Sequence, residues 1–151
     1  IHDRLRARGI ALPHAAAPVA SYQPVVVDGH TAFVSGQLPF VDGELVTGKL
    51  GEGVTLEQGQ QAARACGLMI LAQLEAHDLL ERVERVVKLG GFVASVPDFT
   101  DQPKVVNGAS DLMAEVFGAE NGVGARSAVG MGSLPGNITT EVEVIVELSE
   151  E

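Results

Sequence analysis

The chain has 151 residues, of which 46% are hydrophobic and only 4% aromatic, as expected for one domain with a mainly aliphatic core. The formal net charge is −10 and the basic residues are scattered, which argues against nucleic acid as the main partner because phosphate binding needs clustered Lys and Arg. The lone Cys66 excludes an internal disulfide, no apolar run is long enough to span a membrane, and the polar first residues are unlike a signal peptide, so we expect a cytoplasmic protein.

The first forty residues predict a short helix, an extended strap and a β-hairpin. Residues 1–8 can form a short helix, and two prolines make residues 11–18 extended. Val25–Val27 and Thr31–Leu38 are strand-like runs. The Asp28-Gly29 pair between them is typical of a hairpin turn.

Two amphipathic helices are predicted after a glycine-rich loop. Thr55 and Gln58 form the pattern of a capping box, which opens a helix expected to reach about His77. The second helix is expected to begin at Asp101–Pro103, since proline is tolerated in a first turn, and to end near Gly118. Its apolar stripe consists of Val105, Val106, Ala109, Leu112, Met113, Val116 and Phe117.

Three further strands complete the pattern at residues 83–96, 125–131 and 139–148, giving the order β-β-α-β-α-β-β. The last strand alternates between valines on one face and glutamates on the other. Two helices are enough to cover only one face of a sheet. The other face, which carries Glu141 and Glu143, must therefore meet water or another subunit, and its mixed polar and apolar character favours a subunit interface.

Several patterns that could indicate a ligand have a simpler structural explanation. Residues 43–50 resemble a phosphate-binding loop, but Leu50 stands where magnesium binding needs Ser or Thr, and no helix follows directly. The four histidines share no metal-ligand spacing, so we predict no metal site, and His30 is expected in the first hairpin turn. Cys66 is expected to be a small buried hydrophobe.

Arg126 is the strongest candidate for a functional residue. It lies at the start of a strand whose other residues are small and apolar. Its side chain therefore either points to solvent or is positioned for a function. The guanidinium group suits bidentate binding of a carboxylate. Glu141 and Glu143 on the following strand offer a nearby acid or base. The alternative is a structural Arg–Glu pair across a hairpin.

Seven stretches, taken in order, resemble one known family. They are Ser21-Tyr22, Val34-Ser-Gly-Gln-Leu-Pro39, Gly91-Phe-Val-Ala-Ser-Val-Pro-Asp-Phe99, Val105-Val-Asn107, Ala125-Arg-Ser-Ala-Val129, Leu134-Pro135 and Glu141-Val-Glu143. This ordered set resembles the YjgF/RidA-like family of reactive intermediate deaminases, also called UPF0076-type proteins or endoribonuclease L-PSP. The matching part is a single domain at residues 20–151, and residues 1–19 look like the N-terminal extension, or strap, of a longer subgroup.

The resemblance implies a fold and an activity. The fold is a chorismate-mutase-like α/β fold of the α+β type, with a mixed sheet and two helices on one face, assembled as a homotrimer with a pocket at each subunit interface. Well-characterised members hydrolyse 2-imino or enamino acids to 2-keto acids and ammonia without a cofactor. In this chain, the matching Arg126 would grip the substrate carboxylate and Glu141 would assist the attacking water. The residues that would shape the pocket are Tyr22, Ser35, Gly36, Asn107 and Ala128.

Two departures from the family pattern leave alternatives open. Ala128 stands where the typical deaminase has Cys, which is acceptable only if that position acts through its backbone carbonyl. Thr140 precedes Glu141 where an apolar residue is usual, so Glu143 stays a possible working glutamate. The first alternative function is a non-catalytic trimer that binds or senses a small carboxylate. An endoribonuclease is disfavoured by the acidic charge and by the lack of a basic, aromatic groove.

Overall fold

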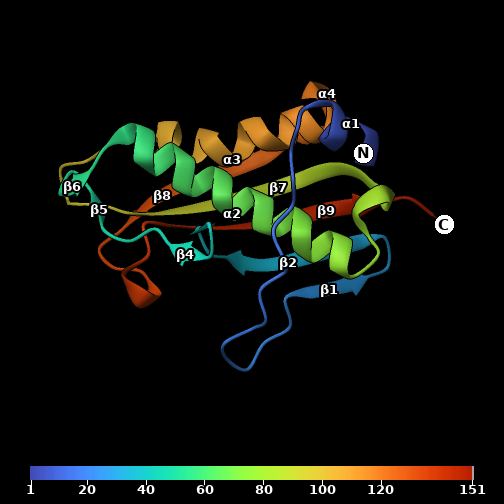
Figure 1. Cartoon of the computed structure of the whole chain (residues 1–151), viewed down its shortest axis with the longest axis horizontal. Coiled ribbons are helices and arrows are strands. Elements are labelled where there is room, and N and C mark those ends of the chain that lie inside the picture. The colour runs from blue at the N-terminus through green and yellow to red at the C-terminus, as the bar shows by residue number, and fades with distance from the viewer. Residues whose placement is uncertain (151) are drawn as a thin grey trace.

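A five-stranded mixed sheet with two long helices on one face forms the body of the protein, which a computed structural model describes over residues 1–150 (Figure 1). The strand order in the sheet is β1-β2-β9-β7-β8. Its strands and helices are β1 (Val25–Asp28), β2 (Thr31–Gln37), α2 (Leu56–Ala76), β7 (Val83–Ala94), α3 (Gln102–Phe117), β8 (Ala125–Met131) and β9 (Thr140–Leu148). The predicted fold class, the order β-β-α-β-α-β-β and the placement of both helices on one face are confirmed.

Local signals in the sequence account for most of these elements. Thr55 is the N-cap of α2. Its hydroxyl accepts a hydrogen bond from the backbone N–H of Gln58, and the side-chain oxygen of Gln58 accepts one from the backbone N–H of Thr55, which confirms the capping box. The first hairpin turns through Gly29, at φ +63°, and His30 lies in that turn as predicted. No helix within residues 1–150 combines the length and the apolar character needed to cross a membrane.

The segment predicted as a glycine-rich loop contains more structure than expected. It holds the short strands β3 (Phe40–Val41), β4 (Glu44–Leu45), β5 (Lys49–Leu50) and β6 (Gly53–Val54). The β3–β4 hairpin turns through Asp42 and Gly43, both at positive φ, which is the geometry of a two-residue Asp-Gly turn. Leu50 is fully buried, so the segment closes one end of the core.

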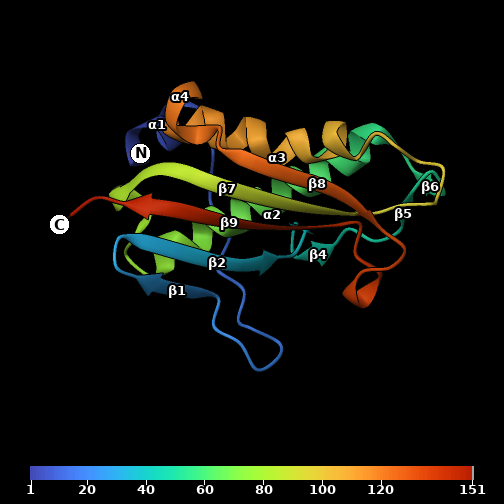
Figure 2. The same cartoon turned by 180° about the vertical axis from the view of Figure 1, so that it is seen from behind.

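The two faces of the sheet differ sharply. Val142, Val144 and Val146 of β9 are buried against the helices, whereas Glu143 is exposed and Glu141 half-buried on the opposite face. Figure 2 shows this second face, which no helix covers. Phe33 of β2 is 43% exposed there, in register with Ile145. The expectation of a helix-free face with mixed polar and apolar character is confirmed.

The structure corrects the predicted neighbourhood of Arg126. The chain does not make a hairpin between β8 and β9, because β7 lies between them, pairing in parallel with β8 and antiparallel with β9. A loop with a 3₁₀ turn at Pro135–Asn137 carries the chain past the end of β7 instead. The expected adjacency of Arg126 to Glu141 and Glu143, and the structural Arg–Glu pair across a hairpin, are therefore wrong.

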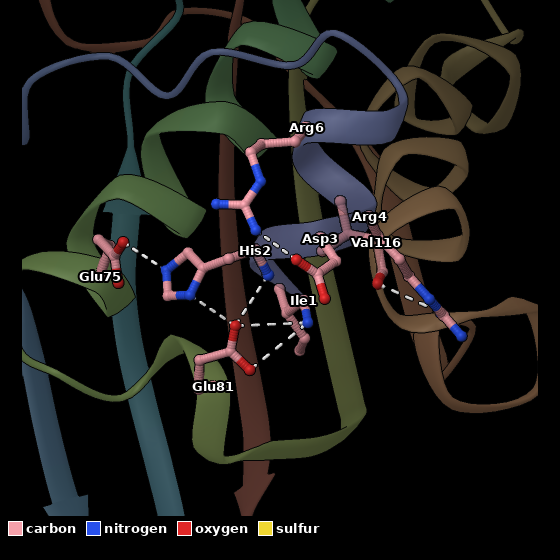
Figure 3. A network of polar contacts seen from close by, with 8 residues as sticks. All are labelled: Ile1, His2, Asp3, Arg4, Arg6, Glu75, Glu81 and Val116. Atoms are coloured by element: carbon pink, nitrogen blue, oxygen red, sulfur yellow. Dashed lines mark hydrogen bonds and ion pairs between the residues drawn. The ribbon is translucent and has the colours of Figure 1, made fainter.

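The N-terminal residues fold back onto the helical layer. The short helix α1 (His2–Ala7) is anchored at both sides, because Arg4 donates to the carbonyl of Val116 at 3.3 Å and the His2 ring lies 2.6 Å from both Glu75 and Glu81 (Figure 3). From α1 the strap crosses α2 before it reaches β1 (Figure 1). A short helix α4 (Ala119–Gly122) follows α3 directly.

Candidate functional site

A β-bulge in β2 brings a carboxylate against a glycine. Val34 pairs with Val144 and Gln37 with Val142, so Ser35 and Gly36 together face only one residue of β9. The Glu141 carboxylate lies directly over Gly36, where an added Cβ would be 2.8 Å from Glu141 Cδ. Only glycine permits this close approach, which explains a glycine inside the strand.

Four of the predicted site residues share one pocket, with a volume of about 510 Å³. Tyr22, Ser35, Gly36 and Glu141 all line it, together with their chain neighbours, one residue of β4 and the loop before β9. Those further residues are Val19, Ala20, Leu38, Leu45, Pro135, Gly136 and Ile138. A mostly apolar cleft of this size with one carboxyl group at its wall is suited to a small polar ligand.

The environment of Glu141 changes its protonation. Burial of the carboxyl group raises the pKa of Glu141, and the negative charge of Glu143 on the same strand raises it further. Ser35 is held in place because its hydroxyl donates to the carbonyl of Gln23 at 2.6 Å. A half-buried carboxyl whose pKa is raised in this way holds its proton more readily than an exposed one, which suits a group that exchanges protons with a bound water or substrate.

A second cluster surrounds Arg126. One guanidinium nitrogen donates to Asn107 Oδ1 at 2.7 Å and to Ser110 Oγ at 3.3 Å. Asn107 and Ser110 are one turn apart on α3, so both face the start of β8. Arg126 is exposed, so a ligand can reach its other two guanidinium nitrogens, Nε and Nη2, and this pair suits a carboxylate. Ala128 packs its methyl group toward the core, so position 128 offers a ligand mainly its backbone.

The two clusters lie on opposite faces of the sheet. Arg126 is in register with Leu89, whose side chain is buried toward the helices. Glu141 is in register with Phe92, three residues further along β7, and it points to the helix-free face. Three residues along a strand and two strand spacings place the two Cα atoms roughly 14 Å apart. Within one chain, these side chains cannot hold the same small molecule.

Some lining residues were not identified from the sequence. Ser110 could have been found, because it stands three residues after Asn107 on a predicted helix. The lining residues Val19 and Ala20 come from the extended segment before β1, and Leu45 from the β3–β4 hairpin, and neither segment carries a pattern that indicates chemistry. They reach the pocket only through the tertiary fold.

The remaining sequence motifs have structural explanations. Cys66 is fully buried, with Sγ 3.3 Å from Thr140 Oγ1, and burial raises its pKa to about 12. A thiol with this pKa is a poor nucleophile, which confirms it as a buried hydrophobe. Among the residues that the structure describes, no three His, Cys, Asp or Glu side chains gather in a way that could hold a metal ion.

Comparison with known proteins identifies relatives along the whole domain. Residues 2–148 match the model of a protein family described as "YjgF/chorismate mutase-like, putative endoribonuclease". Protein TCP17 of Trypanosoma cruzi is 50% identical, covering 96% of this chain and 92% of that protein. A 2-iminobutanoate/2-iminopropanoate deaminase of Dermatophagoides farinae is 31% identical, covering 92% and 94%.

A solved structure has the same fold as this chain. Protein Atu1372 of Agrobacterium tumefaciens, described as having unknown function, superposes with a TM-score of 0.88 at 47% identity. The match covers 97% of this chain and 91% of that one.

Proposed function

The chain belongs to the YjgF/chorismate mutase-like family, and on this basis we propose that it hydrolyses small 2-imino acids to 2-keto acids and ammonia, at sites shared between subunits of a homotrimer. The observation that carries this proposal is the split between two half-sites. The first half-site, Tyr22, Ser35, Gly36 and Glu141, has a pocket and a proton-transfer group. The second, Arg126 with Asn107 and Ser110, has the cation but lies on the other side of the sheet.

Assembly of several chains would complete the site. In a ring of identical subunits, one surface of each chain meets a different surface of the next, so two half-sites on different faces can come together. The helix-free face offers the apolar surface for such contacts, because Phe33 and Val129 are each more than 40% exposed on it. Exposed apolar patches of this kind are typical of interaction surfaces.

The chemistry needs few groups. A protonated 2-imino acid already has an electrophilic carbon, and Arg126 would orient it by binding the carboxylate through Nε and Nη2, because Asn107 and Ser110 already take the hydrogens of Nη1. Glu141 of the neighbouring chain would accept a proton from water as its oxygen bonds to the imine carbon. The same carboxyl would return that proton to the nitrogen of the carbinolamine. As the C–N bond breaks and its electron pair leaves with nitrogen, the regenerated Glu141 carboxylate would take the hydroxyl proton, so that ammonia is released and the 2-keto acid remains; the proton then passes to solvent or to ammonia.

The surroundings of each group support these roles. Asn107 and Ser110 both bond to one nitrogen of Arg126, which fixes the direction of the guanidinium group. The raised pKa of Glu141 is favourable for a group that must both take and give a proton. Ala128 would act only through its backbone, because its side chain has no polar atom and packs toward the core.

A coupled assay tests this proposal. An amino-acid oxidase or a dehydratase generates 2-iminopropanoate or 2-iminobutanoate, and semicarbazide traps the imine that survives. We expect the wild-type protein to reduce the trapped imine, and Arg126→Ala to have lost this effect while keeping its fold, because Arg126 is exposed. A folded wild-type oligomer that leaves the imine yield unchanged would refute the deaminase activity for these substrates.

One observation favours a second function, a trimer that binds a small carboxylate without turnover. The position after Ser127 carries Ala128 and therefore no thiol, so if the reaction requires one, only binding remains. Calorimetry with 2-oxobutanoate separates the two functions. Binding that depends on Arg126, without any acceleration of imine loss, would favour the carboxylate-binding protein.

A further inference from the structure

A second and larger cavity lies beside α2 and has no lining residue in common with either half-site. Its volume is about 800 Å³. The floor is α2, one wall is residues 11–16 of the strap, and the other wall is the β3–β4 hairpin. The strap runs across α2 at this level (Figure 1). Nothing in the proposed deaminase chemistry uses this cavity.

The lining suits a small uncharged apolar molecule. Most of its surface comes from apolar side chains, namely Leu12, Pro13, Ala16, Phe40, Val41, Leu68 and Met69. The cation at the floor, Arg64, already binds both oxygens of Glu115 at 3.3 and 3.4 Å, so an anionic ligand would have to compete for it. A volume of this size is typical of small-molecule sites, and the apolar lining favours an aromatic or branched hydrocarbon body.

The cavity shares two walls with the Glu141 pocket. The strap and the three residues that follow it line the cavity with residues 11–16 and the Glu141 pocket with Val19, Ala20 and Tyr22. The β3–β4 hairpin lines the cavity with residues 40–43 and the Glu141 pocket with Leu45. A ligand that repositions either wall therefore changes the other pocket.

Two buried glutamines connect the strap to the bulge at Gly36. Gln73 of α2 is 2% exposed, and its amide donates to the Ala16 carbonyl at 2.7 Å and to Gln37 Oε1 at 3.2 Å. Gln37 is 5% exposed and donates to the Ser35 carbonyl at 2.9 Å. Buried amides are strongly held to their partners, because an unmatched polar group is costly inside a protein. This relay joins the cavity wall to the residue before Gly36.

We propose that the cavity under the strap is an effector site for a small uncharged aromatic or branched apolar molecule, and that the Gln73–Gln37 relay transmits its occupancy to the bulge that supports Glu141. The binding half of this inference is independent of the deaminase reaction. The regulatory meaning of the coupling rests on the proposed function. A bound ligand would contact Ala16 and Met69, which both line the cavity. These two residues are joined by a hydrogen bond of 3.4 Å from the Ala16 N–H to Met69 Sδ.

Binding can be tested with indole, because the chain contains no tryptophan and indole fluorescence is therefore distinct. We expect a blue shift of indole emission and saturable binding. Val41→Asp should weaken the affinity about tenfold by placing a charge in the apolar lining. The matched control is Val123→Asp, which changes another exposed valine that lines neither cavity. No binding, or binding equally weakened by both substitutions or by neither, would overturn the effector site.

Coupling can be tested by hydrogen exchange at Ser35 and Gly36, which needs no substrate and so is independent of the deaminase assay. Saturating indole should change exchange of these amides about threefold or more in the wild type. Gln73→Met should bind indole but lose this response. Bound indole without any change at the bulge in the wild type would overturn the coupling, even if Gln73→Met fails to fold, and so would an unchanged response in a folded Gln73→Met.

Discussion

Gly36→Ala is a perturbation of a single methyl group whose effect follows directly from the geometry of the bulge. The new Cβ would lie 2.8 Å from Cδ and 2.9 Å from Cγ of Glu141, and closer still to Oε2. Ordinary carbon contacts begin at about 3.5 Å, so the carboxyl group must move by about 0.7 Å or more. The side chain of Glu141 is half-buried and flexible, so it can move without disturbing the backbone.

We expect Gly36→Ala to lower the rate of the reaction and to leave the stability of the fold nearly unchanged. Displacement of a catalytic group by about 1 Å can lower the rate about 100-fold. The folded state should keep its stability to within about 1 kcal/mol, because Gly36 has no positive φ and alanine is not disfavoured in a strand relative to glycine.

The assay compares four variants in the imine-trapping reaction, namely Gly36→Ala, Glu141→Asp, their double variant and Gly132→Ala, each with its thermal midpoint measured. Gly132→Ala is the matched control, because a Cβ added there meets nothing within 4 Å. Shortening the acid in Gly36→Ala/Glu141→Asp removes the overlap, so we expect the two substitutions to be non-additive. Full activity of Gly36→Ala would refute the assignment of Glu141 to the site, and so would an equal loss in Gly132→Ala.

Three further outcomes are expected. Burial and the charge of Glu143 raise the pKa of Glu141 in the folded state above its value in the unfolded state. The protonated Glu141 side chain therefore contributes its full stabilisation below about pH 4, and this stabilisation is lost as the pH rises through the folded-state pKa. Glu141→Gln should therefore be more stable than the wild type at neutral pH but not under acid conditions, as measured by urea unfolding; a gain that grows toward low pH contradicts this sign. Cys66, whose pKa is about 12, should resist a disulfide reagent until the protein unfolds, and rapid labelling of the native protein would contradict its burial. Gly108→Ala should lower the free energy of unfolding by about 1–3 kcal/mol, because the new Cβ would lie 2.9 Å from the carbonyl carbon of Gln60 in the neighbouring helix α2. A change below about 0.5 kcal/mol would contradict this and show that the two helices can move apart at little cost.

The sequence predicted the elements whose signals are local. The capping box at Thr55 and the Asp28-Gly29 turn each depend on a few adjacent residues, and both are present. The Asp42-Gly43 turn carries the same local signal, but the strands beside it are only two residues long and have no readable periodicity. Such short strands depend on the surrounding fold for their pairing.

The arrangement of the site could be predicted only in part. The alternation in β9 correctly placed Glu141 on the helix-free face, since Val142, Val144 and Val146 of this strand are all buried on the other face. The face of Arg126 had no such signal, because every residue of the edge strand β8 is exposed or half-buried, so its sequence does not alternate between a buried and an exposed face. The insertion of β7 between β8 and β9 is a long-range pairing, which no local pattern encodes.

The most direct test of a shared site is complementation between two inactive variants. Arg126→Ala and Glu141→Gln are each purified, unfolded together and refolded as a mixture. If each site takes Arg126 from one subunit and Glu141 from the next, about a quarter of the sites in a random equal mixture contain both groups. We expect about a quarter of wild-type imine hydrolysis to return, while each variant refolded alone stays inactive. A mixed oligomer with no regained activity, beside a wild-type control that refolds to full activity, would contradict a shared site.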